Sequence, residues 1–245
     1  MRTKLIAANW KMNTTLAEAH ILADGVRNGL EDMETIDVAL FPPTIWLAEL
    51  AQRIAPGSIA HLKLGAQNMY FEEKGAFTGE TSPGMVKEVA EYVLVGHSER
   101  VHVFHETPDL LTAKVQAAFA HGLIPILCIG EEKQEEGSKR QLVHALNHMV
   151  KVLSEEQLER LVVAYEPVWA IGSGTPATPE YAQEIIMALR TALTPKTRIL
   201  YGGSATDENA KGFLEQEDID GLLIGGASLK LKVFLTMCQI AADLN

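Results

Sequence analysis

The sequence predicts an α/β fold, a single-domain (β/α)8 barrel of eight parallel strands ringed by helices, and three observations predict it. Short apolar runs recur along the chain, and a longer segment with helical periodicity follows each of them. Several runs are apolar at nearly every position, as expected for parallel strands buried on both faces. The length of 245 residues suits eight βαβ units of roughly 30 residues each. An open doubly wound sheet is the alternative, because periodicity alone cannot close a barrel.

The pattern places the elements in a regular order, strand then helix, with no linker that would divide residues 1–245 into two domains. The eight predicted strands are 5–8, 38–41, 62–64, 93–95, 124–129, 161–165, 199–201 and 222–224. Amphipathic spacing predicts helices over 17–30, 109–121, 139–153, 179–193 and 229–244. The polar stretch 131–140 is typical of a solvated loop and helix start.

Composition excludes several function classes. The net charge of −11 disfavours binding to a nucleic-acid backbone, although a local site for a small anion can still be positive. The N-terminus lacks the pattern of a signal peptide, and no apolar stretch approaches the roughly 18 residues of a membrane helix. Cys128 and Cys238 lie far apart and form no metal-ligand cluster, so we expect a reduced, cytoplasmic protein with no metal site and no membrane partner.

Polar residues follow three of the predicted strands, at the end of the barrel where catalytic groups are expected. Asn9 and Lys11 follow the first strand and would both face the barrel mouth. His97 follows the fourth strand where a helix should begin, and the helix dipole would keep its ring neutral; a structural histidine is the alternative. Glu166 lies between a buried strand and a proline, where partial desolvation would raise its pKa towards that of a useful general base.

Two further features follow the later strands. An apolar segment between a proline and two glycines suits a lid that closes as a body and sheds water, although a loop packed permanently on the barrel is the alternative. The predicted lid comprises Pro167, Val168, Trp169, Ala170, Ile171, Gly172, Ser173 and Gly174. Glycine pairs after strands seven and eight would let backbone N–H groups approach an anion, helped by a short helix starting at Gly226.

Taken together, these segments resemble the triosephosphate isomerase family, in the same order and over nearly the whole chain. The segments that carry the resemblance are 9–13 (NWKMN), 65–68, 75–83, 96–100 (GHSER), 128–131 (CIGE), 164–174 (AYEPVWAIGSG), 201–204 (YGGS) and 223–229 (LIGGASL). The resemblance implies a cofactor-independent isomerase of glycolysis and gluconeogenesis that interconverts dihydroxyacetone phosphate and D-glyceraldehyde 3-phosphate through an enediolate.

The resemblance also implies roles for individual residues. Glu166 would move a proton between neighbouring carbons, neutral His97 would act on the two oxygens, and Lys11 with Asn9 would stabilise the developing negative charge. Backbone N–H groups would bind the phosphate at Gly172, Ser204, Gly225 and Gly226. Glu99 would support the lysine and Cys128 the base, although Cys128 suits a buried packing role equally well.

A homodimer is implied by the resemblance, with residues 67–82 as the loop that enters a second subunit. Gln67 begins this loop, and Thr78 near its tip would approach the partner's active site. Three positions depart from the usual family pattern: Val101 replaces an arginine, His105 replaces a glycine, and Pro176 stands where a lysine-threonine pair is frequent. Two other readings remain open at this point, a different phosphate-binding barrel isomerase and a catalytically silent homologue.

Overall fold

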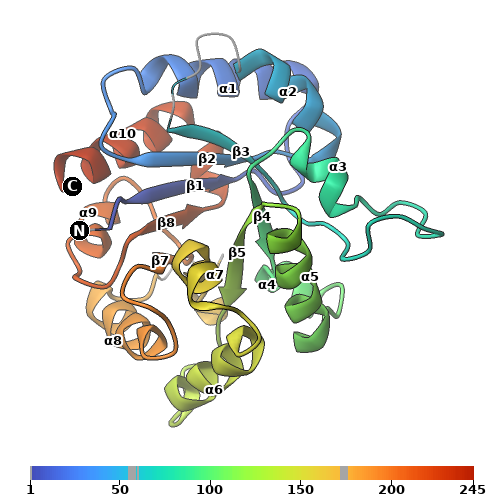
Figure 1. The fold of residues 1–245 in the computed structure, drawn as a ribbon. Coiled ribbons are helices and arrows are strands. Elements are labelled where there is room, and N and C mark those ends of the chain that lie inside the picture. Colours follow the sequence, from blue (N-terminus) through green and yellow to red (C-terminus); the bar gives the residue numbers. More distant parts are fainter. Residues whose placement is uncertain (1, 55–58, 60, 172–175) are drawn as a thin grey trace.

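Eight parallel strands close into a barrel in a computed structural model of the chain, which describes residues 2–54, 59, 61–171 and 176–245 (Figure 1). Each strand pairs with the next in sequence, and β8 pairs with β1 through Leu5 opposite Gly221 and Ala8 opposite Ile224. The strands are β1 (Leu5–Asn9), β2 (Asp37–Phe41), β3 (Leu62–Ala66), β4 (Tyr92–Val95), β5 (Ile124–Ile129), β6 (Val162–Tyr165), β7 (Arg198–Tyr201) and β8 (Gly221–Ile224). The closed barrel confirms the predicted fold class and excludes the open sheet.

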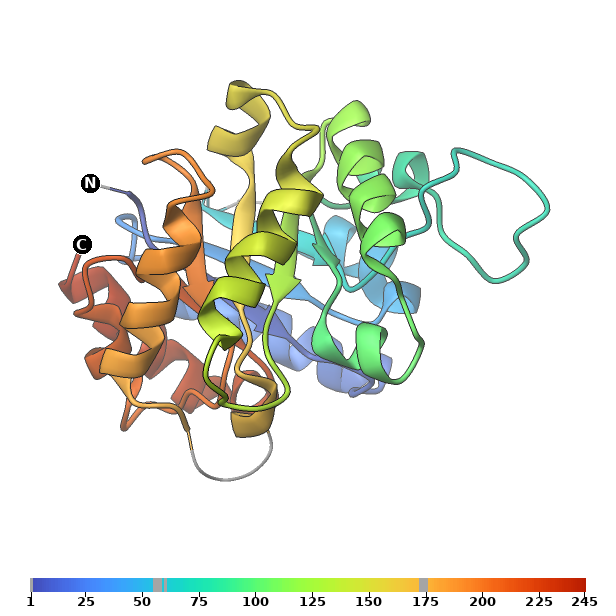
Figure 2. The ribbon, with the colours of Figure 1, turned by 90° about the horizontal axis from the view of Figure 1, so that it is seen from below.

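Helices surround the barrel (Figures 1 and 2). They are α1 (Leu16–Gly29), α2 (Leu47–Ile54), α3 (Pro83–Lys87), α4 (Ser98–His102), α5 (Pro108–Ala120), α6 (Ser138–Val150), α7 (Glu155–Arg160), α8 (Pro179–Arg190), α9 (Ala210–Leu214) and α10 (Leu231–Asp243). Three 3-10 turns, η1 (Thr44–Trp46), η2 (Val168–Ala170) and η3 (Gly226–Leu229), complete the described elements. Among these helices, none has the length and apolar character to cross a bilayer.

The predicted helices are present with small shifts at their ends. The last one begins at Leu231 rather than 229, because the preceding residues form the 3-10 turn η3. The sequence did not single out α2, α3, α7 and α9, which span only five to eight residues each. Segments of about two turns or fewer are too short for periodicity alone to distinguish a helix from a strand or loop.

Side chains alternate along each strand between the barrel interior and the layer beneath the helices. In β1, Leu5 and Ala7 belong to the interior cluster, whereas Ile6 and Ala8 pack in the layer that includes the helices. All five residues of β1 are buried, and four of them, Leu5 to Ala8, are apolar. This double burial accounts for the continuous apolar runs in the sequence.

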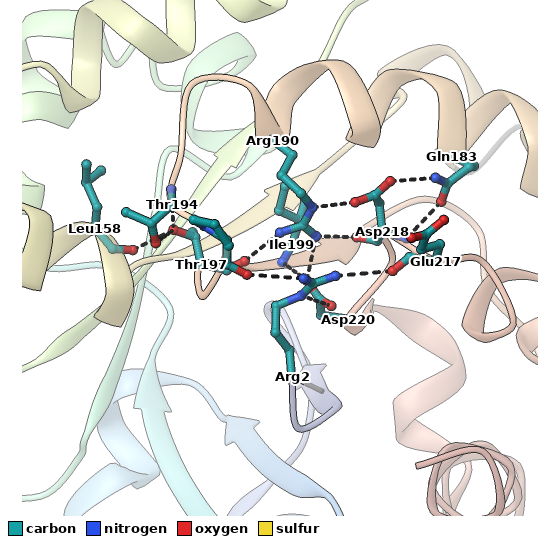
Figure 3. Close-up of polar contacts among 11 residues, drawn as sticks. Arg2, Leu158, Gln183, Arg190, Thr194, Thr197, Ile199, Glu217, Asp218 and Asp220 are labelled. Carbon is teal, nitrogen blue, oxygen red and sulfur yellow. Dashed lines mark hydrogen bonds and ion pairs between the residues drawn. The ribbon is translucent and has the colours of Figure 1, made fainter.

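Paired charges hold together the barrel end at which the strands begin (Figure 3). The carboxylate of Asp220 accepts hydrogen bonds from Arg2 Nε at 2.6 Å, Arg190 Nη2 at 2.8 Å and the Ile199 N–H at 2.8 Å. Arg190 Nε also donates to Asp218 at 2.5 Å. This network, Arg2–Arg190–Asp218–Asp220, joins the N-terminal segment and α8 to the starts of β7 and β8.

Candidate active site

Glu166 lies at the opposite end of the barrel, directly after β6. Its backbone N–H donates to the Ile129 carbonyl at 2.8 Å, and the Gly202 N–H donates to the Tyr165 carbonyl at 2.7 Å. The ladder therefore continues on both sides of Glu166 and holds its backbone between β5 and β7. Only 2% of Glu166 is exposed, and it lines a cleft of about 600 Å³ together with Asn9, Lys11 and His97.

The Glu166 carboxylate has one hydrogen-bonded oxygen and one free oxygen. Oε2 accepts from the Ser98 N–H at 2.8 Å. Oε1 lies 3.1 Å from His97 Nε2 without hydrogen-bond alignment, and it has no hydrogen-bond partner among the described residues. Burial raises the pKa of Glu166, and the opposing effects of His97, Ser98 and Lys11 offset only part of that rise. A carboxylate with a raised pKa and a free oxygen is suited to accept a proton.

Two glycines make room for Glu166, and a third makes room for the nearby Tyr201. A Cβ on Gly130 would lie 1.6 Å from the Glu166 carbonyl oxygen, and one on Gly202 would lie 3.0 Å from Glu166 Cγ. A Cβ on Gly203 would lie 2.2 Å from the Tyr201 hydroxyl oxygen. Sequence reasoning connected none of these glycines with the position of Glu166. The close approach of the chain after β5 to Glu166 requires a residue without a side chain at Gly130.

His97 is the N-cap residue of α4, and this position determines its tautomer. Its Nδ1 accepts from the Glu99 N–H at 3.3 Å. A ring nitrogen that accepts a hydrogen bond carries no proton, so a neutral ring carries its proton on Nε2. Nε2 is the nitrogen nearest Glu166 Oε1. The N–H of His97 therefore faces the cleft, where a substrate oxygen can accept it.

Lys11 and Asn9 line the same cleft, although Lys11 is not extended as the alternation argument assumed. Lys11 has φ 53°, a left-handed conformation that L-residues adopt at an energetic cost and that often marks functional sites. Asn9 Oδ1 accepts from the Lys11 N–H at 3.0 Å and supports this turn. Lys11 Nζ pairs with Glu99 Oε1 at 2.6 Å, and a Cβ on Gly225 would lie 3.1 Å from Lys11 Cε.

Three of the four residues expected to bind phosphate are described by the structure, and these three line the cleft. Ser204, Gly225 and Gly226 all line it, and η3 begins at Gly226. A Cβ on Gly226 would meet no atom of the described residues within 4 Å, so on their side its backbone is open to a ligand. The expected fourth member, Gly172, lies outside the described residues, as do the lid residues Ser173 and Gly174.

The described part of the lid, Pro167 to Ile171, rests on Glu131. Glu131 Oε1 accepts from the Tyr165 hydroxyl at 2.8 Å, Trp169 Nε1 at 2.9 Å and the Tyr181 hydroxyl at 3.3 Å. Its carbonyl accepts from the Val168 N–H at 3.0 Å. At Glu131 the expectation of a solvated stretch over 131–140 is wrong, because this carboxylate is buried beneath aromatic side chains.

Cys128 is buried in the barrel interior near the base. Burial and the neighbouring Glu166 carboxylate raise the pKa of the Cys128 thiol well above its ordinary value. The thiol therefore stays protonated. Its position fits both hypotheses from the sequence, a packing role in the barrel interior and a role in supporting Glu166.

The segment with Gln67 and Thr78 leaves the body of the molecule after β3, and Figures 1 and 2 show it projecting to one side. Gln67 Nε2 donates to the carbonyls of Lys11 and Phe41, both at 2.8 Å, and ties the base of the loop to the active-site strands. Residues 72–80, which include Thr78, are exposed.

A buried ion-pair network lies behind His97. Glu106 Oε1 accepts from Arg100 Nε at 2.7 Å and Lys114 Nζ at 2.6 Å, and Lys114 also donates to Asn68 at 2.7 Å. The network therefore connects α4 with the projecting loop. His105, where the family usually has glycine, has φ 58°, the left-handed region that favours glycine.

The chain matches the family model described as triosephosphate isomerase over residues 4–241. The matched range contains every strand of the barrel and every residue of the cleft described above. Within the described residues, no group of three His, Cys, Asp or Glu side chains is arranged to hold a metal ion.

Proposed function

The chain belongs to the triosephosphate isomerase family, and we propose that Glu166, His97 and Lys11 carry out its reaction, the interconversion of dihydroxyacetone phosphate and D-glyceraldehyde 3-phosphate. The supporting observation is the buried Glu166 carboxylate, whose free oxygen lies 3.1 Å from the proton-bearing nitrogen of His97. A base and a hydrogen-bond donor side by side suit proton abstraction next to a carbonyl group.

The reaction begins when Glu166 removes a proton from the carbon next to the carbonyl and forms an enediolate. His97 Nε2–H donates to the oxygen that gains negative charge, and proton exchange through this ring moves the hydroxyl proton between the two oxygens. Glu166 then returns its proton to the neighbouring carbon. No atom is gained or lost overall, so the chemistry needs no oxidant and no cofactor.

The Lys11 ammonium group stabilises the negative charge of the enediolate and of the phosphate. Asn9 supports the backbone turn at Lys11. Glu99 positions the Lys11 ammonium group. Backbone N–H groups at Gly172, Ser204, Gly225 and Gly226 bind the phosphate, and this binding energy closes the lid, Pro167 to Gly174, over the reacting carbons. Closure excludes water, from which the enediolate must be protected because it would otherwise lose phosphate.

A coupled assay with glyceraldehyde 3-phosphate tests these roles in the wild type, Glu166→Asp and His97→Gln. We expect each variant to lose at least about 100-fold in kcat/KM, roughly 2.7 kcal/mol of transition-state stabilisation, while the fold is retained. The exposed Lys196→Gln serves as a control with wild-type turnover. Normal rates in both active-site variants would refute the roles, and an inactive wild type would point instead to a catalytically silent homologue.

We also propose that the enzyme is a homodimer, built through the loop 67–82, and that it acts in the cytoplasm. A second cleft of about 500 Å³ lies at the base of this loop and is lined by Gln67 and Glu99. Exposed apolar side chains flank it, which supports an interface there. The apolar residues of this cleft include Met12, Ile45 and Phe104. Light scattering should give twice the chain mass of 26.8 kDa, and Thr78→Arg should shift it towards that single-chain value.

A further inference from the structure

We propose that Lys230 is a steering residue for the isomerase reaction, a cation on the rim of the cleft that draws the substrate dianion to its phosphate site. The inference rests on the function proposed above, because it requires a substrate that carries a phosphate. Lys230 lines the same cleft as Ser204, Gly225 and Gly226. No role for it followed from the sequence.

The backbone of Lys230 is fixed where η3 meets α10. Its N–H donates to the Ala227 carbonyl at 3.2 Å, and its own carbonyl accepts from the Phe234 N–H at 3.0 Å. Its side chain is exposed and makes no ion pair or hydrogen bond with the residues that the structure describes. The backbone thus fixes the root of a side chain that has no described partner and that lines the same cleft as the open Gly226.

The electrostatic surroundings make this charge important. The protein has a net charge of −11, which repels an anionic substrate at long range. Among the described cleft residues, only Lys11 and Lys230 are lysines or arginines, and Lys11 is already paired with Glu99 at 2.6 Å. Glu166 and Asp207 add carboxylates to the same cleft. Lys230 is therefore the cation that is left to attract a dianion.

Steering has a kinetic consequence because triosephosphate isomerases are among the enzymes whose kcat/KM reaches the diffusional ceiling, about 10⁸–10⁹ M⁻¹s⁻¹. At that ceiling, the rate of encounter limits turnover at low substrate concentration. A charge near the cleft mouth changes the encounter rate, and added salt screens its effect. A steering residue thus affects kcat/KM in a salt-dependent way and leaves kcat unchanged.

The experiment compares Lys230→Gln with Lys232→Gln at ionic strengths from 0.01 to 1 M. Lys232 is an exposed lysine two residues along the chain, without a described ion pair and outside the cleft, so its variant changes the net charge equally. At 0.01 M, Lys230→Gln should lower kcat/KM for glyceraldehyde 3-phosphate about three- to tenfold. The loss should shrink below about twofold at 1 M, and Lys232→Gln should change kcat/KM by less than about 1.5-fold throughout.

Asp207→Asn provides a test in the opposite direction, because it removes a carboxylate from the same cleft and should raise kcat/KM at low salt. Added viscogen should lower the wild-type kcat/KM in proportion to viscosity. Equal losses in the two lysine variants, a loss independent of salt, a fall in kcat, or a wild-type rate insensitive to viscosity would each overturn the proposal. The wild-type turnover in the same assay tests the proposed function separately.

Discussion

The two ends of the barrel differ in how completely a buried carboxylate is hydrogen-bonded. At the end where strands begin, Asp220 accepts two hydrogen bonds from arginines and one from a backbone N–H (Figure 3). At the end where strands finish, Glu166 accepts one hydrogen bond from a backbone N–H, and its second oxygen has no partner among the described residues. The first carboxylate is fully paired, and the second is left able to react.

This difference shows how one scaffold separates stability from chemistry. Charges paired by arginine lock the strand starts in register and have no capacity left to exchange protons. The strand ends instead hold a desolvated base and a left-handed lysine, both of which lower stability, beside the open backbone of Gly226. Loss of a paired charge at the strand starts should therefore reduce mainly stability, whereas loss of a catalytic group at the strand ends should reduce mainly activity.

The largest effect is expected for Glu166→Gln. It removes the base, so kcat/KM should fall at least about 1,000-fold, some 4 kcal/mol. Burial raises the pKa of Glu166 in the folded protein above its ordinary value of 4.5, so ionising it costs stability as pH rises through that interval. Glutamine is always neutral, and the variant should melt at a higher temperature than the wild type at pH 7. The gain should vanish below about pH 4.5, and a lower melting temperature at pH 7 would contradict the comparison.

Asp220→Ala should have the opposite effects, a loss of stability with activity retained. It removes the shared partner of two arginines and leaves the buried Ile199 N–H without its acceptor, which should cost about 1–3 kcal/mol of unfolding free energy. Well below its melting temperature, the variant should keep wild-type kcat, because Asp220 lies at the far end of the barrel from Glu166. Urea unfolding measures the first effect and the coupled assay the second. Lys211→Gln, which breaks an exposed pair with Glu215, is the control and should change stability by less than about 0.5 kcal/mol.

Effects of intermediate size are expected when the tyrosine hydroxyls that donate to Glu131 are removed. Tyr181→Phe removes the longest of the three hydrogen bonds, 3.3 Å, and should destabilise the enzyme by about 0.5–1 kcal/mol. Tyr165→Phe removes a 2.8 Å bond at a buried site and should destabilise it more, by about 1–3 kcal/mol. Thermal unfolding gives both values. If the order were reversed, Glu131 would not be the group that organises these aromatic side chains.

The smallest effect is expected for His105→Gly. The left-handed φ of 58° is strained for histidine by about 1–2 kcal/mol and is free for glycine, although glycine loses more chain entropy on folding. The net result should be a stabilisation of at most about 1 kcal/mol, seen as a rise of a few degrees in melting temperature with unchanged kcat. A fall in melting temperature would mean that the His105 side chain makes a stabilising contact that outweighs its strain.

Local sequence patterns determined much of this protein. Short apolar runs identified all eight strands, and several are apolar on both faces because a parallel strand inside a barrel is buried whichever way its side chains point. Glu166 and His97 could be found because Glu166 follows such a run directly and His97 follows one after a single glycine, at the end where catalytic groups gather. These features depend on residues that are neighbours in the chain.

Only the tertiary structure decided which distant residues meet. Glu131 stands in a polar stretch, and nothing near it in sequence reveals that Tyr165, Trp169 and Tyr181 will cover it. Arg2 and Asp220 are 218 positions apart, and closure of β8 onto β1 brings them together. Burial and pairing of a charge depend on what the fold packs around it, and a linear pattern carries no information about neighbours that arrive from the far end of the chain.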